Sequence, residues 1–222
     1  MKVNDGLRRH PREGGDPGRL LRNVWRVAGI PACAGMAFAL AILAPASSAD
    51  AHTGVEHALS FAAGFAHPWT GLDHMLAMVA VGLWAGLNGG RALWVWPAAF
   101  VSVMLGGGAL AMSGVPMPLV EPGVLASVIG LGLLVLLAAR LPVAVGAVLV
   151  GLFAVLHGHA HGAELPNEGV VLEYAAGFAL ATALLHVMGL IVAFLSRSDA
   201  ARLVVRGAGA LVVAAGVALT LA

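Results

Sequence analysis

The sequence predicts an all-α membrane protein, in which an N-terminal signal peptide precedes a bundle of six transmembrane helices. Hydrophobic residues make up 60% of the 222 residues and charged residues only 10%, whereas soluble domains carry about 25% charged residues. Six apolar segments are long enough to cross a bilayer, and the connections between them are short. Short connections favour antiparallel neighbours, so we expect an up-and-down bundle in lipid.

The formal net charge of +1 hides an uneven distribution of basic residues. Seven of the twelve Lys and Arg residues lie within positions 2–26, and no lysine follows that segment. The body therefore lacks a basic surface for nucleic acid and a phosphate-binding loop for nucleotides. The single cysteine, Cys33, lies in the N-terminal segment, which excludes disulfides and thiolate metal sites from the body.

Residues 1–51 have the organisation of a secretory signal peptide. A basic region over 1–26 precedes an apolar segment over 27–44, and Ala49 and Ala51 form a small-residue cleavage site. Cleavage would make His52 the first residue of a transmembrane domain over 52–222, and its free amine and imidazole would form a chelating pair. An uncleaved first helix and a translation start further downstream are the alternatives.

Six segments after His52 are predicted to span the membrane, each close to the roughly 20 residues that a bilayer requires. Their approximate bounds are 70–88, 92–113, 122–140, 142–160, 171–195 and 203–221. The preceding stretch, 53–66, is amphipathic and too short to span, so we expect a helix that lies at the membrane interface.

The arginines predict the orientation of the bundle. Signal cleavage leaves the mature N-terminus outside the inner (plasma) membrane, and the order of the spans then fixes every other connection. Every arginine of the mature chain then falls on the cytoplasmic side, as the positive-inside rule requires. These residues are Arg91, Arg140, Arg197, Arg202 and, just inside the last helix, Arg206. The opposite, periplasmic side is rich in histidine and acidic residues.

The first polar motif, His67-Pro-Trp-Thr-Gly-Leu-Asp73-His74, stands at the start of the first span. His67 and His74 are seven residues apart, which places them on one face of a continuous helix. An alternative is a capping box in which Thr70 and Asp73 satisfy the first turn of that helix. Two histidines beside a carboxylate at the edge of a membrane nevertheless indicate a metal-ligand set.

The second polar motif ends the fourth span. His157 and His161 are separated by four residues, a chelating geometry on a helix, and Glu164 continues the same face if the helix persists past Gly162. His159 points roughly the opposite way, so it is a secondary candidate. The alternative is a histidine-rich loop that only contacts lipid headgroups.

Two further residues are secondary candidates for metal binding. His186 lies about fifteen residues into the fifth span, where it could be a deeper ion station, a proton relay or a hydrogen-bond partner between helices. Glu173 stands at the outer end of that span, where it could be an outer ligand or a charge favoured by the helix dipole.

These motifs resemble those of the HupE/UreJ family of hydrogenase and urease accessory membrane proteins, regarded as nickel or cobalt permeases. The family motif His-x5-Asp-His matches at His67, Asp73 and His74. The motif Phe-His-Gly-x-(Ala/Val)-His-Gly-x-Glu matches from His157 to Glu164, with Leu156 in place of the leading phenylalanine. The resemblance covers the mature chain and implies a non-enzymatic permease for nickel or cobalt that supplies metalloenzyme maturation.

Two other functions fit the same residues. Three histidines and a carboxylate can hold zinc with a position open to water, which would make the protein an intramembrane zinc hydrolase. A metal-binding accessory protein that passes ions to a partner without transport is the other alternative. The expected partners are the metal cation and the lipid bilayer, with a homo-oligomer as an open question.

Overall fold

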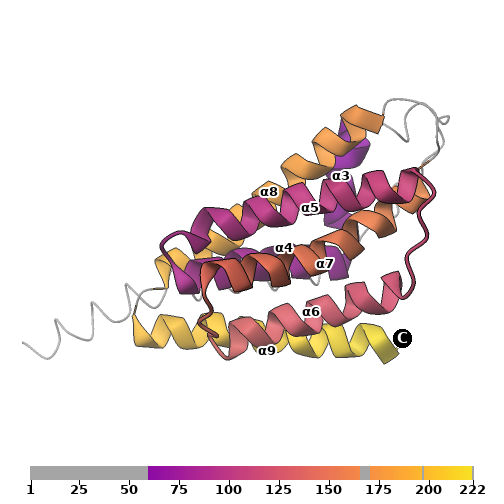
Figure 1. Cartoon of the computed structure of the whole chain (residues 1–222). Helices are drawn as coiled ribbons and strands as arrows, with labels where there is room; N and C mark the ends of the chain where they lie inside the picture. The colour runs from indigo at the N-terminus through magenta and orange to yellow at the C-terminus, as the bar shows by residue number, and fades with distance from the viewer. Residues whose placement is uncertain (1–59, 166–170, 197, 222) are drawn as a thin grey trace, which may run out of the picture.

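The computed structural model describes residues 60–165, 171–196 and 198–221, and all regular secondary structure within these ranges is helical (Figure 1). The predicted signal peptide over 1–51, His52 and Arg197 lie outside the described residues. The seven helices are α3 (Phe61–Thr70), α4 (Leu72–Asn88), α5 (Ala92–Met112), α6 (Val120–Leu136), α7 (Val143–Glu164), α8 (Val171–Leu195) and α9 (Asp199–Leu221).

Their lengths and compositions are those of a multi-pass membrane protein. Helices α5, α7, α8 and α9 are each long and apolar enough to cross a bilayer. Helices α3 and α4 pass the same test only together, and they meet at a bend of 86°. Helix α6 is apolar but has 17 residues. Each of the six predicted spans therefore corresponds to a helix, while the number that crosses the membrane stays a prediction.

The bounds of several helices differ by a few residues from the approximate bounds of the predicted spans. Helix α4, which corresponds to the first predicted span, begins at Leu72 because Gly71 separates it from α3. The described part of the stretch expected at the membrane interface belongs to α3, which begins at Phe61, runs on through His67 and Pro68 to Thr70 and packs against α8. Helix α9, which contains the last predicted span, begins at Asp199, where the Ser198 hydroxyl accepts a hydrogen bond from the Ala201 amide at 3.2 Å.

Helix α6, the fourth of the seven described helices, ends at Leu136, four residues before the predicted bound of 140. Ala138 adopts a left-handed conformation with φ 48°. The amides of Ala138 and Ala139 donate to the carbonyls of Val135 and Leu134, which is the hydrogen-bond pattern of a Schellman motif. The freed carbonyl of Ala139 accepts hydrogen bonds from Trp84 Nε1 at 2.8 Å and from Asn88 Nδ2 at 3.1 Å.

Glycines bring the helices together in three units whose backbones touch, as small residues allow in membrane bundles. In the α5–α7 unit, a Cβ at Gly158 would overlap the carbonyl of Met104. In the α3–α4–α8 unit, a Cβ at Gly82 would overlap the carbonyl of His186, and one at Gly177 would overlap that of Phe61. In the α6–α9 unit, a Cβ at Gly209 would lie 2.5 Å from the amide nitrogen of Leu136.

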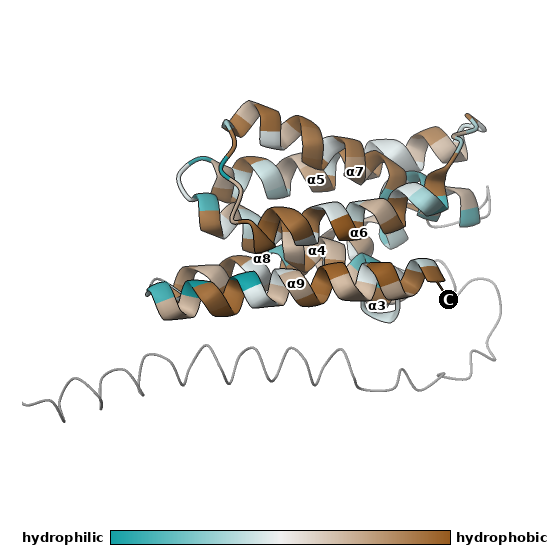
Figure 2. Cartoon of the chain, turned by 90° about the horizontal axis from the view of Figure 1, so that it is seen from below, coloured by the Kyte–Doolittle hydropathy of each residue, from teal (hydrophilic) through white to brown (hydrophobic). Residues whose placement is uncertain are grey.

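Polar residues gather at the ends of the bundle and in its interior. Figure 2 shows hydrophobic residues along the lengths of α6 and α9, with hydrophilic residues at the start of α9. Arg140, Arg202 and Arg206 line one hollow at that end, and the turn that carries Arg91 lies at the same end (Figure 1). The expected gathering of arginines on one side is therefore confirmed for the described residues.

Two buried tryptophans pack against each other in the core near the arginine end of the bundle. The rings of Trp84 and Trp96 are stacked with centroids 4.0 Å apart, and both residues are fully buried. Trp96 Nε1 donates to the carbonyl of Val143 at 2.9 Å, as Trp84 donates to Ala139. Buried tryptophans need such partners for their N–H groups, so the pair is anchored to the connection after α6 and to the first residue of α7.

Candidate metal centre

Four imidazoles converge toward the end of the bundle opposite the arginines. His67 comes from the last turn of α3, His74 from the first turn of α4, and His157 and His161 from the last two turns of α7. The ring centroids of His67 and His161 are 4.6 Å apart, those of His161 and His74 are 4.3 Å apart, and those of His74 and His157 are 4.9 Å apart. The two predicted motifs therefore meet in space.

The outer part of this cluster has the spacing of a metal-ligand set. One donor atom from each of His67, His161 and Glu164 lies within 4.8 Å of the other two. His161 is buried and Glu164 is exposed, so the three donors lead from solvent into the bundle. Two imidazoles and a carboxylate suit divalent first-row transition metals and leave coordination positions open.

Helix α7 carries its three donors on one face because it continues to Glu164 without a break at Gly162. His157, His161 and Glu164 are spaced by four and three residues, which places them one above the other. The helix therefore persists past Gly162, as the alignment of Glu164 with the two histidines requires. The alternative of a histidine-rich loop is wrong, since all three residues are helical.

The first motif is bent and not continuous. Helix α3 ends at Thr70, whose hydroxyl donates to the carbonyl of His67 at 2.8 Å. Gly71 precedes α4, so Thr70 does not cap it and the capping-box interpretation is wrong. A Cβ at Gly71 would lie 3.0 Å from His74 Nδ1 and 3.1 Å from Asp73 Oδ1. Glycine at the bend therefore leaves room for the pair formed by Asp73 and His74.

Asp73 orients His74. Its Oδ1 lies 2.7 Å from His74 Nδ1 and accepts the His74 amide at 2.8 Å. The carboxylate thus holds the Nδ1–H tautomer of His74 and leaves the Nε2 lone pair free. His74 Nε2 is buried without a hydrogen-bond partner. A carboxylate behind a histidine is the usual second partner of a metal-bound imidazole, and it raises the basicity of the ligand.

His157 is oriented by Ser127 of α6, a residue that the sequence interpretation did not identify. The Ser127 hydroxyl donates to the carbonyl of Val124 at 2.6 Å and lies 2.8 Å from His157 Nε2. Because a hydroxyl has one proton, His157 Nε2 must donate to it, and Nδ1 keeps its lone pair. Nδ1 is buried without a partner. A lone serine in an apolar span was the available sequence signal, since such residues hydrogen-bond across membrane helices.

His161 lies at the centre of the cluster and has no hydrogen bond to hold it. Both of its ring nitrogens are buried without a partner. Its ring lies against His67, His74 and Phe178, the last with centroids 4.6 Å apart. Buried nitrogens without partners are uncommon in proteins, and here the ring of His161 contacts that of His74, whose Nε2 is also buried without a partner. Such a set can bind a cation.

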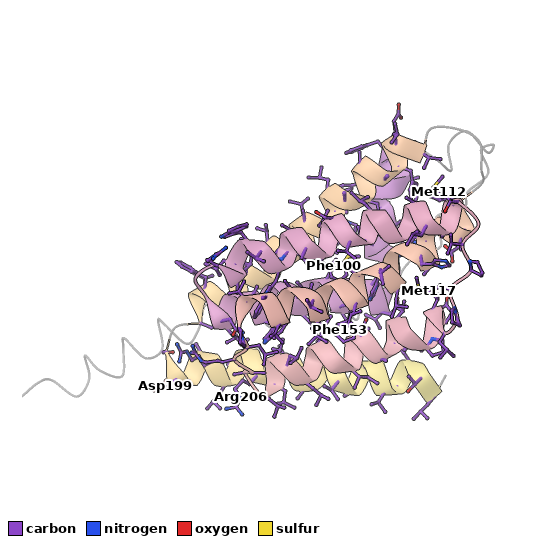
Figure 3. All side chains as sticks on the ribbon, in the orientation of Figure 1. Phe100, Met112, Met117, Phe153, Asp199 and Arg206 are labelled. Atoms are coloured by element: carbon purple, nitrogen blue, oxygen red, sulfur yellow. The ribbon has the colours of Figure 1, made fainter. Side chains whose placement is uncertain are left out.

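His186 lies deeper and outside this cluster. It is 1% exposed, and neither ring nitrogen has a hydrogen-bond partner. Of the three roles that the sequence left open for His186, a hydrogen bond between helices is therefore wrong. Phe100 of α5, labelled in Figure 3, separates it from the cluster, with its ring centroid 5.1 Å from that of His186 and 5.6 Å from that of His157.

The other two described candidates point elsewhere. His159 Nε2 donates to the carbonyl of Val115 at 2.8 Å, so its ring ties α7 to the connection after α5, as its opposite direction on the helix predicts. Glu173 is exposed on the first turn of α8 and is not one of the three grouped donors. Tyr174, its neighbour, packs beside His67 instead, with ring centroids 6.1 Å apart.

The fold and the cluster thus define a multi-pass helical membrane protein with histidines that converge from three helices. The HupE / UreJ protein family model matches residues 40–219. Protein HupE from Rhizobium leguminosarum bv. viciae is 49% identical over 180 residues, which cover 81% of this chain and 94% of the relative. The chain therefore belongs to the HupE/UreJ family of hydrogenase and urease accessory proteins. No solved structure matches it.

Proposed function

We propose that this protein is a permease for a divalent transition-metal cation, nickel or cobalt, that supplies the maturation of a hydrogenase or urease. The observation that carries the proposal is the grouping of His67, His161 and Glu164 donor atoms within 4.8 Å. Membership of the HupE/UreJ family supports nickel or cobalt as the cargo.

The cation would be captured in stages. Glu164, exposed at the outer end, attracts the hydrated ion, and His67 and His161 replace part of its water shell. The free lone pairs of His74 Nε2 and His157 Nδ1 lie next in line. Asp73, proposed from the sequence as a ligand, acts here as the residue that positions His74. His186 is the next polar side chain inward, beyond Phe100.

We place the cluster on the periplasmic side of the inner membrane and the arginines on the cytoplasmic side. The arginines of the described chain gather at the end opposite the cluster, which agrees with the positive-inside rule. In this orientation the membrane potential favours inward movement of a divalent cation by about 4.6 kcal/mol per 100 mV, since each charge contributes about 2.3. No nucleotide is required for uptake of this kind.

Uptake of radioactive nickel and cobalt into proteoliposomes tests the proposal. Vesicles that contain the purified protein should accumulate either ion faster than protein-free vesicles, and a negative interior potential should increase the rate. Binding without uptake would instead support an accessory protein that hands ions to a partner. One resident zinc per chain, with hydrolytic activity and no uptake, would support the intramembrane hydrolase.

Replacement of Asp73 by asparagine should weaken cation binding by roughly 10- to 100-fold, the usual effect of losing a second partner of a metal ligand. Asparagine can still accept the proton of His74 Nδ1, but it removes the charge that raises the basicity of the ring. The measurement is the dissociation constant for nickel in detergent, together with the KM of uptake. A loss as complete as that of a ligand histidine would show that Asp73 binds the ion directly, and an unchanged constant would exclude both roles.

A further inference from the structure

A hollow of about 410 Å³ lies at the arginine end, between the connection that follows α6 and the first two turns of α9. Among the described residues, three guanidinium groups line it, from Arg140, Arg202 and Arg206, and Asp199 is the only acidic one. These four described side chains together carry a net charge of +2. Figure 3 shows Asp199 and Arg206 at the same end of α9.

Within the part of the chain that the structure describes, no acidic side chain forms an ion pair with the three arginines. Arg206 Nε donates to the carbonyl of Leu136 at 2.7 Å, which satisfies the end of α6 and leaves the four N–H groups of its terminal nitrogens. Among the described residues, no carboxylate oxygen lies within 4.0 Å of the three guanidinium groups. The hollow therefore presents unpaired donors that suit an anion with several oxygen atoms.

The remaining lining residues indicate where the anion comes from. Leu87 and Leu203 are apolar and belong to the same hollow. Leu203 is 63% exposed, and Leu211, two turns further along α9, is 66% exposed. An exposed apolar face of a membrane-spanning helix lies against acyl chains, so the charged hollow and the apolar face together follow the shape of one lipid. A free phosphate would use only the charged part.

We propose that Arg140, Arg202 and Arg206 bind the phosphate of an anionic phospholipid, whose acyl chains lie along α9. Basic pockets at the cytoplasmic ends of transmembrane helices are suited to such headgroups. The bound phosphate would join the connection after α6 to the start of α9 at the point where Arg206 already contacts Leu136. This lipid site is separate from the histidine cluster and does not depend on which ion the cluster binds.

The test compares lipids by native mass spectrometry of the full chain in detergent, with thermal unfolding as a second readout. Phosphatidylglycerol should be retained in preference to phosphatidylcholine and should raise the unfolding temperature more. The double variant Arg140→Gln/Arg202→Gln should lose this preference by roughly tenfold or more, since each basic residue contributes measurably to anionic lipid binding. The double variant Arg140→Lys/Arg202→Lys should retain most of the preference, because it keeps the charge.

Arg91→Gln is the matched control, since Arg91 lies at the same end of the bundle but does not line the hollow. It should bind phosphatidylglycerol as the wild type does. Equal retention of the two lipids by the wild type would overturn the proposal, as would a preference that survives in the double glutamine variant. Displacement of phosphatidylglycerol by millimolar inorganic phosphate would also overturn it, because the hollow would then be a site for free phosphate.

Discussion

Replacement of His161 by alanine is expected to lower cation uptake by more than about 100-fold. This loss is larger than the one expected for Asp73, which positions a ligand and does not bind the ion itself. His161 is the only residue in the described chain whose ring contacts both His67 and His74, and it belongs to the group with Glu164. Without His161, no ligand connects the outer donors, His67 and Glu164, with the inner donors, His74 and His157. Nickel binding in detergent and uptake into proteoliposomes should fall together.

His159→Gln is the matched control for this prediction. His159 lies two residues away on the same helix, but its ring donates to the Val115 carbonyl instead of joining the cluster. Glutamine can supply a similar donor, so binding and uptake should stay close to wild type. Wild-type uptake by the His161 variant would refute the assignment of the cluster as the transport site, while equal losses in both variants would indicate damage to the helix.

Replacement of Gly158 by alanine is expected to destabilise the protein strongly, although it changes no polar group. A Cβ at this position would overlap the Met104 carbonyl and would lie 3.0 Å from the amide nitrogen of Gly108. Neither backbone can move unless α5 and α7 separate. Overpacking in a tight core costs about 3 kcal/mol at the upper end of its usual range, which corresponds to roughly 10 °C in Tm.

Gly106→Ala provides the comparison, because no atom lies within 4 Å of a Cβ built at Gly106 on the partner helix. This variant should unfold at or slightly above the wild-type temperature, since alanine favours a helix more than glycine does. Thermal unfolding of the three proteins in the same detergent, followed by tryptophan fluorescence, is the measurement. Equal Tm values for Gly158→Ala and Gly106→Ala would mean that α5 and α7 are not in backbone contact.

The spacing of residues predicted the helical part of the site well. The face shared by His157, His161 and Glu164 follows from intervals of four and three, and the structure confirms it. Its approach to the first motif followed from the expected topology, because both motifs were placed at the same side of the bundle. Periodicity and charge distribution are properties of the local sequence, so they could be read without the tertiary structure.

Tertiary details could not be predicted in the same way. The end of α6 depends on the left-handed conformation of Ala138. Glycine usually occupies such a position, so an alanine does not indicate it in the sequence. The bend at Gly71 changes Asp73 from a capping residue to the partner of His74. The role of Ser127 becomes visible only when α6 lies beside α7. In each case, a contact between distant segments decides what the local sequence leaves open.

The glycine contacts divide the cluster between two of the three units. His67 and His74 belong to the α3–α4–α8 unit, whereas His157, His161 and Glu164 belong to the α5–α7 unit. An apolar hollow of about 550 Å³, lined by Met104, Gly158 and Phe178, also lies between these units. Backbones already in contact leave little freedom within a unit, so any relative movement of the helices would take place at the boundary that crosses the cluster. A cation held by donors from both units would act as a cross-link, and its release would be coupled to their separation.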